Sequence, residues 1–283
     1  MNIVRTRIDV GAQRPFKALH ISDNHIAFAD QRDGQRKVDL AQKRAAAFAR
    51  SGRLAEDLLA EQLDYARQNN LLVLHTGDLI DFVSLKNLEY ARDALKDIDY
   101  FMAVGNHEFS LYVGEAFEDV PYKMQSYDLV QSYFRNNLLF DSRVVNGVNF
   151  VAVDDGYYLF DERQLKQLKG EVAKGLPIVL MMHNPLHTDA FFRNEIDVVG
   201  NPCAYLTGTP VELMGGYDPY RLRQQRPDEA TLAFIDYVYA QPLIRAVLAG
   251  HLHHPWEGPL PSGIMQYVAD GGYHDYAREI EFV

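Results

Sequence analysis

Five short polar blocks in this chain carry the residue types that bind transition metals, and each block follows a run of apolar residues. Their side chains offer carboxylates, amides and imidazoles, but no thiolate. Such an oxygen and nitrogen donor set suits Mn, Fe or Zn in an open catalytic site better than zinc in a closed structural site. The blocks are Asp23-Asn24-His25, Gly77-Asp78-Leu79-Ile80-Asp81, Gly105-Asn106-His107-Glu108, His183-Asn184 and Gly250-His251-Leu252-His253.

The number of candidate ligands predicts two metal ions. One ion takes about four protein ligands, and the blocks supply enough for two ions that share a carboxylate. Two ions roughly 3.5 to 4 Å apart can activate a shared water and hold both oxygens of an in-line displacement at phosphorus. The candidate ligands are Asp23, His25, Asp78, Asn106, His183, His251 and His253.

The apolar runs before the blocks are predicted to be strands, because they are short and end in polar turns. A wholly apolar run is typical of a strand that is buried on both faces of its sheet. Such a strand delivers the residue that follows it to a site. The predicted strands cover residues 16–22, 71–74, 100–104, 177–182 and 244–249.

Helical patterns alternate with these strands, which indicates α/β layering. Residues 30–70 have apolar positions spaced for a helix face, and Ser51-Gly52 is expected to divide them into two helices. Asn146-Gly147 between two β-rich runs predicts a hairpin. Further helices are expected at about 84–95, 161–174 and from 228 or 229, and closing strands at 264–268 and 278–283.

Residues 184–227 interrupt this alternation, because their Pro and Gly residues leave little room for long regular elements. The segment begins directly after His183 and ends before the helix that leads to His251, so we expect a cap or specificity insertion over the site. The alternative is a surface excursion or a subunit contact. Candidate substrate contacts in the segment are Phe191, Phe192, Tyr205, Tyr217 and Tyr220 for stacking, and Arg193, Arg221, Arg223 and Arg226 for phosphate or carboxylate.

Length and composition fit one domain over residues 1–283, with 47% apolar residues. The net charge of −11 weakens the case for nucleic-acid binding, which depends on Lys and Arg neutralising phosphates. No apolar run approaches the ~20 residues of a membrane helix. The single cysteine, Cys203, and an N-terminus without a basic-then-apolar pattern favour the cytoplasm. The oligomeric state stays open.

The five blocks, in this order, resemble the signature of the calcineurin-like binuclear metallophosphoesterases, which reads DxH, GDxxD, GNH followed by Asp or Glu, a lone His, and GHxH. The resemblance extends from Asp23 to His253 and covers most of the chain. It implies an α+β fold, a four-layer α/β/β/α sandwich of two mixed sheets flanked by helices. It also implies two divalent or mixed-valence transition metal ions.

The resemblance implies a role for each site residue. His107 matches the histidine that contacts phosphate without binding a metal and protonates the leaving oxygen, and Asp81 matches the acid that orients it. An imidazole beside a carboxylate keeps its charged form more easily, which suits a general acid. The implied ligand sets are Asp23, His25 and His253 for one metal, Asn106, His183 and His251 for the other, and Asp78 as the bridge between them.

The chain departs from two related subfamilies. Protein Ser/Thr phosphatases carry Arg-Gly after GDxxD and Arg before GNH, whereas this chain has Phe82-Val83 and Val104, so that guanidinium clamp is missing. Purple acid phosphatases have a tyrosine iron ligand where this chain has Asp81, so an iron-tyrosinate centre is not expected.

These features predict a hydrolase that cleaves a phosphomonoester or phosphodiester of a small molecule, with a nucleotide among the options. A metal-bridging hydroxide would attack phosphorus while His107 donates a proton. A nuclease of the same family is an alternative that the acidic balance disfavours. A catalytically inactive binding scaffold is the other, and no missing ligand supports it.

Other polar residues receive simpler interpretations. His20 and His75 are expected in the core or behind the site. Cys203 has no basic neighbour in sequence that would make it a nucleophile. His187, His254 and His274 stay open between surface and site, and Asp154-Asp155-Gly156 and Asp270-Gly271-Gly272 are interpreted as turns without chemistry.

Overall fold

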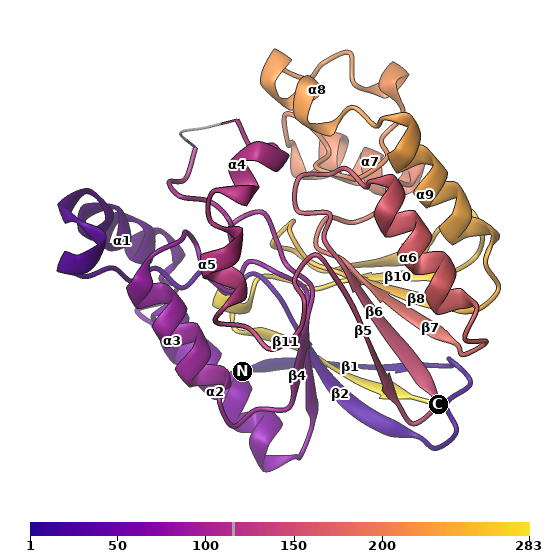
Figure 1. The fold of residues 1–283 in the computed structure, drawn as a ribbon, viewed down its shortest axis with the longest axis horizontal. Coiled ribbons are helices and arrows are strands. Elements are labelled where there is room, and N and C mark those ends of the chain that lie inside the picture. Colours follow the sequence, from indigo (N-terminus) through magenta and orange to yellow (C-terminus); the bar gives the residue numbers. More distant parts are fainter. Residues whose placement is uncertain (115–116) are drawn as a thin grey trace.

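The computed structural model describes residues 1–114 and 117–283, in which two mixed β-sheets pack face to face (Figure 1). The first sheet has the order β1 (Asn2–Ile8), β11 (Tyr276–Phe282), β2 (Phe16–Ile21), β3 (Leu72–His75), β4 (Tyr100–Met102). The second has the order β5 (Phe140–Val145), β6 (Val148–Val153), β7 (Ile178–Met181), β8 (Ile244–Ala249), β10 (Met265–Val268), β9 (Trp256–Pro259).

Helices cover the outer face of each sheet. On the first sheet lie α2 (Ala55–Gln68) and α3 (Leu85–Leu95), and α6 (Glu162–Val172) and α9 (Glu229–Ala240) lie on the second (Figure 1). The four-layer α/β/β/α prediction is thereby confirmed. The remaining helices are α1 (Gln35–Phe48), α4 (Val120–Met124), α5 (Tyr127–Gln131), α7 (Asp189–Arg193) and α8 (Pro219–Gln225).

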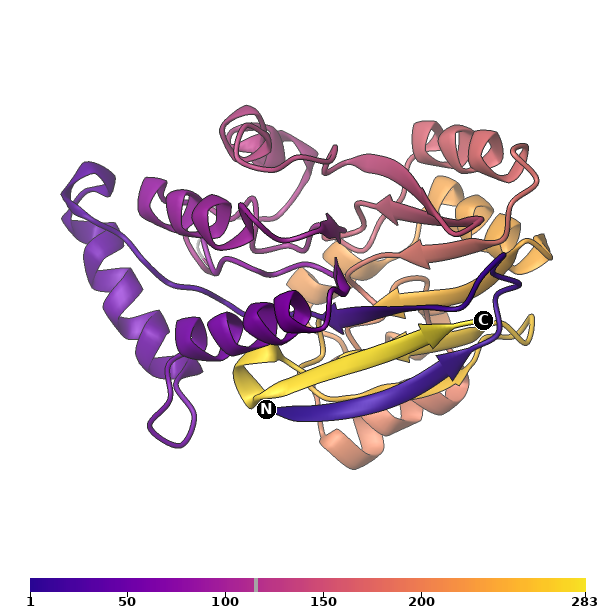
Figure 2. The same ribbon diagram turned by 90° about the horizontal axis from the view of Figure 1, so that it is seen from below.

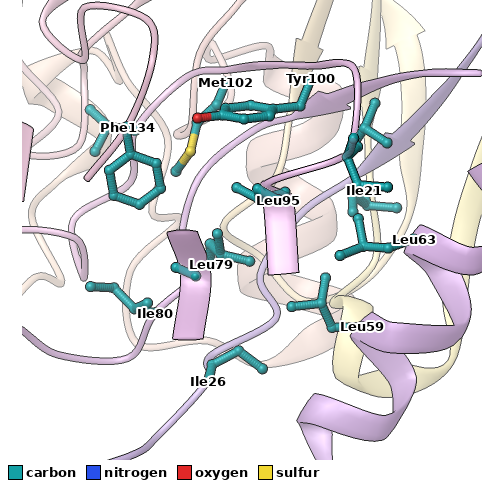
Figure 3. Packing of buried hydrophobic residues seen from close by; sticks show 14 of the residues in the cluster. Ile21, Ile26, Leu59, Leu63, Leu79, Ile80, Leu95, Tyr100, Met102 and Phe134 are labelled. Carbon is teal, nitrogen blue, oxygen red and sulfur yellow. The ribbon is translucent and has the colours of Figure 1, made fainter. Parts of the chain in front are cut away.

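Alternation along the strands produces three apolar layers, because successive side chains of a strand point to opposite faces. In β3, Val73 faces the helices of the first sheet, whereas Leu72 and Leu74 face the second sheet. In β7, Leu180 faces α6 and α9 and Met181 faces the first sheet. Figure 3 shows the layer between the first sheet and its helices, with Leu59 and Leu63 of α2 near Ile21 of β2.

Parallel pairing brings the carboxyl ends of neighbouring strands together. Strands β2, β3 and β4 are parallel neighbours in the first sheet, and β7 and β8 are parallel neighbours in the second. Backbone pairing continues past the strand ends, because the Asp23 amide donates to the Gly77 carbonyl and the His25 amide to the Asp78 carbonyl. Ligands bind at the carboxyl ends of strands in open α/β sheets, so this edge is where a site is expected.

The hairpin and the two helices divided near Ser51-Gly52 form where the sequence predicts them. Asn146 and Gly147 join β5 to β6 with φ values of 47° and 81°, as a two-residue hairpin turn requires. The sequence did not predict β1, whose residues are half polar and which pairs with β11 at the edge of its sheet (Figure 2).

Residues 184–227 contain short helical turns and are partly built into the core. Leu186, Phe191 and Leu206 are fully buried against the layer between the second sheet and its helices. Helix α8, by contrast, lies at the top of Figure 1 and carries the exposed Arg223. Among the described residues, no helix is both long and apolar enough to cross a bilayer.

Candidate metal centre

The polar blocks meet at the carboxyl ends of the strands that precede them. Three overlapping groups of side chains bring one nitrogen or oxygen donor each to within 4.8 Å of one another. Asn106 lies beside them, on the wall of a pocket that it shares with His107 and His251. The groups are Asp23, His25 and His253; His25, Asp78 and His107; and Asp78, His183 and His251.

Two buried histidines are held by acceptors on their Nδ1 side. His25 Nδ1 lies 3.0 Å from an Asp81 carboxylate oxygen, and His183 Nδ1 donates to the Thr76 carbonyl at 2.7 Å. Their Nε2 atoms therefore face inward. The Nε2 of His183 is 3.2 Å from Asp78 Oδ2.

The two histidines of the last block are held by tyrosine hydroxyls. Tyr158 Oη lies 2.6 Å from Nε2 of His251, which leaves its Nδ1 to face His183 Nε2 at 3.1 Å. Tyr273 Oη lies 2.8 Å from Nδ1 of His253, whose Nε2 faces His25 Nε2 at 2.9 Å. Partners that fix one ring nitrogen and aim the other inward are typical of metal-binding histidines.

These inward donors fit a cation. Because Nδ1 of His25 and Nδ1 of His183 are engaged by Asp81 and by the Thr76 carbonyl, the Nε2 atom of each ring faces other nitrogens and carboxylates. Asp23 Oδ1 and Asn106 Oδ1 are also buried, and neither has a hydrogen-bond partner in the described part of the chain. Buried lone pairs that face one another are costly unless a cation or proton lies between them.

The charges of the protein groups also favour a bound cation. Burial lowers the pKa of His25 to about 4, so its ring is neutral. Burial also opposes a charge on His183, but the Asp78 and Asp23 carboxylates outweigh it and raise its pKa to about 10. The same carboxylates that attract a proton to His183 would stabilise a metal ion.

His107 is held by hydrogen bonds to Asp78 and Asp81, the two acidic residues of one block. Its amide donates to Asp78 Oδ1 at 2.8 Å and its Nδ1 to the Asp81 carbonyl at 2.6 Å, with the Asp81 carboxylate 3.3 Å away. Burial disfavours its charged form, yet Asp78 and Asp81 outweigh burial and raise its pKa. Arg44 of α1 holds the Asp81 carboxylate through bonds of 2.6 and 2.8 Å.

Comparison with known proteins identifies the family. The family model of the calcineurin-like phosphoesterases matches residues 16–255. The chain belongs to this family. Its members are metal-dependent phosphohydrolases that typically bind two metal ions, and the Asp and His groups described above could hold them.

Solved structures support the same fold at low identity. A dimetal phosphatase from Danio rerio is 15% identical with a TM-score of 0.52, and the match covers 91% of this chain and 88% of that one. A purple acid phosphatase from yellow lupin (Lupinus luteus) seeds is 14% identical with a TM-score of 0.51, covering 92% of this chain and 44% of that one. A search of curated protein sequences gave no match.

Backbone strain is concentrated at the blocks that define this phosphoesterase. Left-handed φ values between 50° and 73° occur at five of their residues, all of them candidate ligands. Such values are uncommon for residues other than glycine, and they cluster where a site must aim its side chains. The residues are Asp23, His25, Asp78, His251 and His253. A Cβ at Gly105 would also collide with the Asp78 side chain, which explains that glycine.

Several supporting residues carried no signal in the sequence. Glu108 accepts from the amides of Gly105, Asp78 and Leu79 and so joins two blocks. Asp155, interpreted as a turn residue only, also accepts from the His183 amide at 2.7 Å. Tyr158, Tyr273 and Arg44 come from distant segments. Of these supporting residues, only Glu108 could have been suspected, because it lies within the Gly105-Asn106-His107-Glu108 block.

The remaining histidines lie outside the three donor groups. His20 and His75 are buried, as expected, and His75 Nε2 lies 2.9 Å from Asn24 Oδ1 behind the site. His254 pairs with the buried Glu195 at 3.0 Å, and His274 with Asp270 at 2.7 Å.

Proposed function

We propose that this phosphoesterase holds two transition metal ions that share Asp78, and that it hydrolyses a phosphomonoester or phosphodiester of a small molecule. The observation that carries the proposal is the membership of Asp78 in two donor groups, one with His25 and His107 and one with His183 and His251. The ligands proposed for one ion are Asp23, His25 and His253, and for the other Asn106, His183 and His251.

Two bound ions would supply Lewis acidity and an activated water for attack at phosphorus. The chain's own residues supply the rest. His107 lines the pocket, and because its Nδ1 is engaged by Asp81, its Nε2 is left to hold the proton that the leaving oxygen needs. The raised pKa of His107 favours the protonated form that a general acid requires.

The surroundings support a small substrate. A pocket of about 400 Å³ adjoins Asn106, His107 and His251, which is within the usual range for small-molecule sites. A nucleotide is compatible with this volume, and the net charge of −11 argues against a nuclease. Mn, Fe and Zn each suit the donor set. The buried, single Cys203 is compatible with a reducing cytoplasm.

Metal stripping followed by reconstitution tests the proposal. The protein would be treated with a chelator, loaded separately with Mn, Fe or Zn, and assayed on a panel of phosphomonoesters and phosphodiesters. We expect activity to disappear with the metals and to return with at least one of them. Hydrolysis that survives complete metal removal, or no hydrolysis with two ions bound, would contradict the proposal.

A further inference from the structure

The pocket beside the metal centre is lined in part by the segment 184–227. The metal side is formed by Asn106, His107 and His251. Other lining residues are tyrosines, one arginine and one glutamate from three separate segments. These residues are Glu118, Tyr158, Tyr205, Tyr220 and Arg221.

Arg221 of α8 is the one arginine or lysine among the described residues that line this pocket. Its guanidinium lies over the rings of Tyr205 and Tyr220, at 5.1 and 5.3 Å, which holds it in place. One of its terminal nitrogens donates to Gln224 Oε1 at 2.7 Å. Within residues 1–114 and 117–283 it forms no ion pair, so several of its N–H donors are available to a ligand.

The acidic group of the pocket does not neutralise Arg221. Glu118 accepts instead from Gln224 Nε2 at 2.9 Å and from Ser110 Oγ at 3.4 Å. Gln224 thus stands between Glu118 and Arg221 and bonds to both. Burial raises the pKa of the Glu118 carboxyl, which weakens its competition with a bound anion.

Arg221 is separated from the metal side by an aromatic ring. The Tyr205 ring lies 6.0 Å from that of His251 and 5.1 Å from the Arg221 guanidinium. Tyr158 and Tyr205 both adopt left-handed backbone, with φ values of 67° and 55°, like the candidate ligands. The strained backbone therefore continues from the metal centre into this part of the pocket lining, as at a site that orients a ligand.

We propose that Arg221 is a specificity-determining residue that binds a second anionic group of the substrate, beyond the phosphate that is cleaved. This inference rests on the proposed phosphoesterase function and names its substrate class. The substrate is a small phosphoester whose leaving group carries a carboxylate or a further phosphate. Tyr205 and Tyr220 flank the guanidinium and enclose that part of the ligand.

A matched substrate pair tests this assignment. Phenyl phosphate and 4-carboxyphenyl phosphate differ by one carboxylate, and each is compared with itself in wild type and Arg221→Gln, so differences in leaving group cancel. We expect Arg221→Gln to lower kcat/KM ~10- to 100-fold for the carboxylated substrate, the effect of one charge-assisted hydrogen bond, and to change it little for phenyl phosphate. Arg221→Lys, which keeps the charge, should recover part of the loss.

The matched control is Arg223→Gln. Arg223 lies on the same helix, is exposed and packs over Phe117 outside the pocket lining, so neither substrate should respond. Equal losses for both substrates in Arg221→Gln would overturn the inference, because Arg221 would then bind the cleaved phosphate. Unchanged kinetics with both substrates would overturn it as well.

A binding measurement separates this inference from the proposed function. Calorimetry with benzylphosphonate and 4-carboxybenzylphosphonate, which are not hydrolysed, should show a preference of the metal-loaded wild type for the carboxylated ligand, and Arg221→Gln should abolish it. If wild type cleaves neither phosphate ester but keeps this preference, the proposed function fails and the Arg221 assignment stands. If both phosphonates bind equally to wild type, the Arg221 assignment fails alone.

Discussion

The metal centre and the segment 184–227 both line one pocket but are built differently. The candidate ligands follow the ends of regular strands, and a partner in the protein fixes one ring nitrogen of each histidine. The segment has short helical turns, anchored by buried Phe191 and Leu206, while Val198 is 77% exposed. Loops on a rigid scaffold usually carry specificity, so we expect the strand ends to determine the reaction and the less regular segment to select the substrate.

Removing the proton donor should give the largest effect on rate. His107→Ala should keep both metals and lower kcat ~10²- to 10⁴-fold for alkyl phosphoesters, because a general acid is lost. For nitrophenyl phosphoesters, whose leaving group needs little protonation, kcat should fall much less. Steady-state kinetics with both substrate types measures the difference. A loss of equal size for good and poor leaving groups would assign His107 to phosphate binding instead.

Tyrosine substitutions separate the two halves of the metal centre. Tyr158→Phe and Tyr273→Phe each remove one hydroxyl that contacts a candidate ligand, so each should weaken metal affinity ~10- to 100-fold. Calorimetric titration should show weaker binding of one ion only in each variant. Tyr237→Phe on α9, whose ring packs under Lys169, is the control and should titrate like wild type. Unchanged affinities in both variants would refute the orienting role.

Loss of a buried contact that anchors the segment 184–227 should lower the stability of the protein more than it lowers the reaction rate. Glu195 is fully buried and bonds to His254, Asn194 and Asn201. Glu195→Gln weakens these bonds and should lower the free energy of unfolding by about 1–3 kcal/mol. Urea unfolding compares it with Glu212→Gln, an exposed position in the same segment. Identical midpoints would show that Glu195 is not an anchor.

Local patterns were sufficient to predict the strands that end at the blocks and the Asn146-Gly147 turn, because both depend on near neighbours in sequence. Tyr158, Tyr273 and Arg44 were beyond such reasoning, since their partners lie 93, 20 and 37 positions away and leave no periodic signal. The role of Asp155 was likewise beyond reasoning from near neighbours in sequence. Its turn was predicted, but its bond to the His183 amide depends on how two segments pack.

The composition of the segment 184–227 predicted an irregular element with residues for substrate contact, but it could not tell which of those residues line the pocket. Its aromatic and arginine residues were all candidates for substrate contact, yet Phe191 stacks on Trp256 at 4.5 Å in the core. Tyr217 is buried, and its hydroxyl accepts a hydrogen bond from the Ala204 amide at 2.8 Å. Only the fold separates these residues from Tyr205 and Arg221, because burial depends on the neighbours that the chain brings together.

The shared role of Asp78 is tested most directly by electron paramagnetic resonance of the protein loaded with two equivalents of Mn(II). Two ions bridged by one carboxylate lie roughly 3.5 to 4 Å apart and couple magnetically. We predict an exchange-coupled spectrum for wild type, and its loss in Asp78→Asn together with at least one bound ion. Two tightly bound but uncoupled Mn(II) ions in wild type, or a coupled pair that persists in Asp78→Asn, would contradict the account.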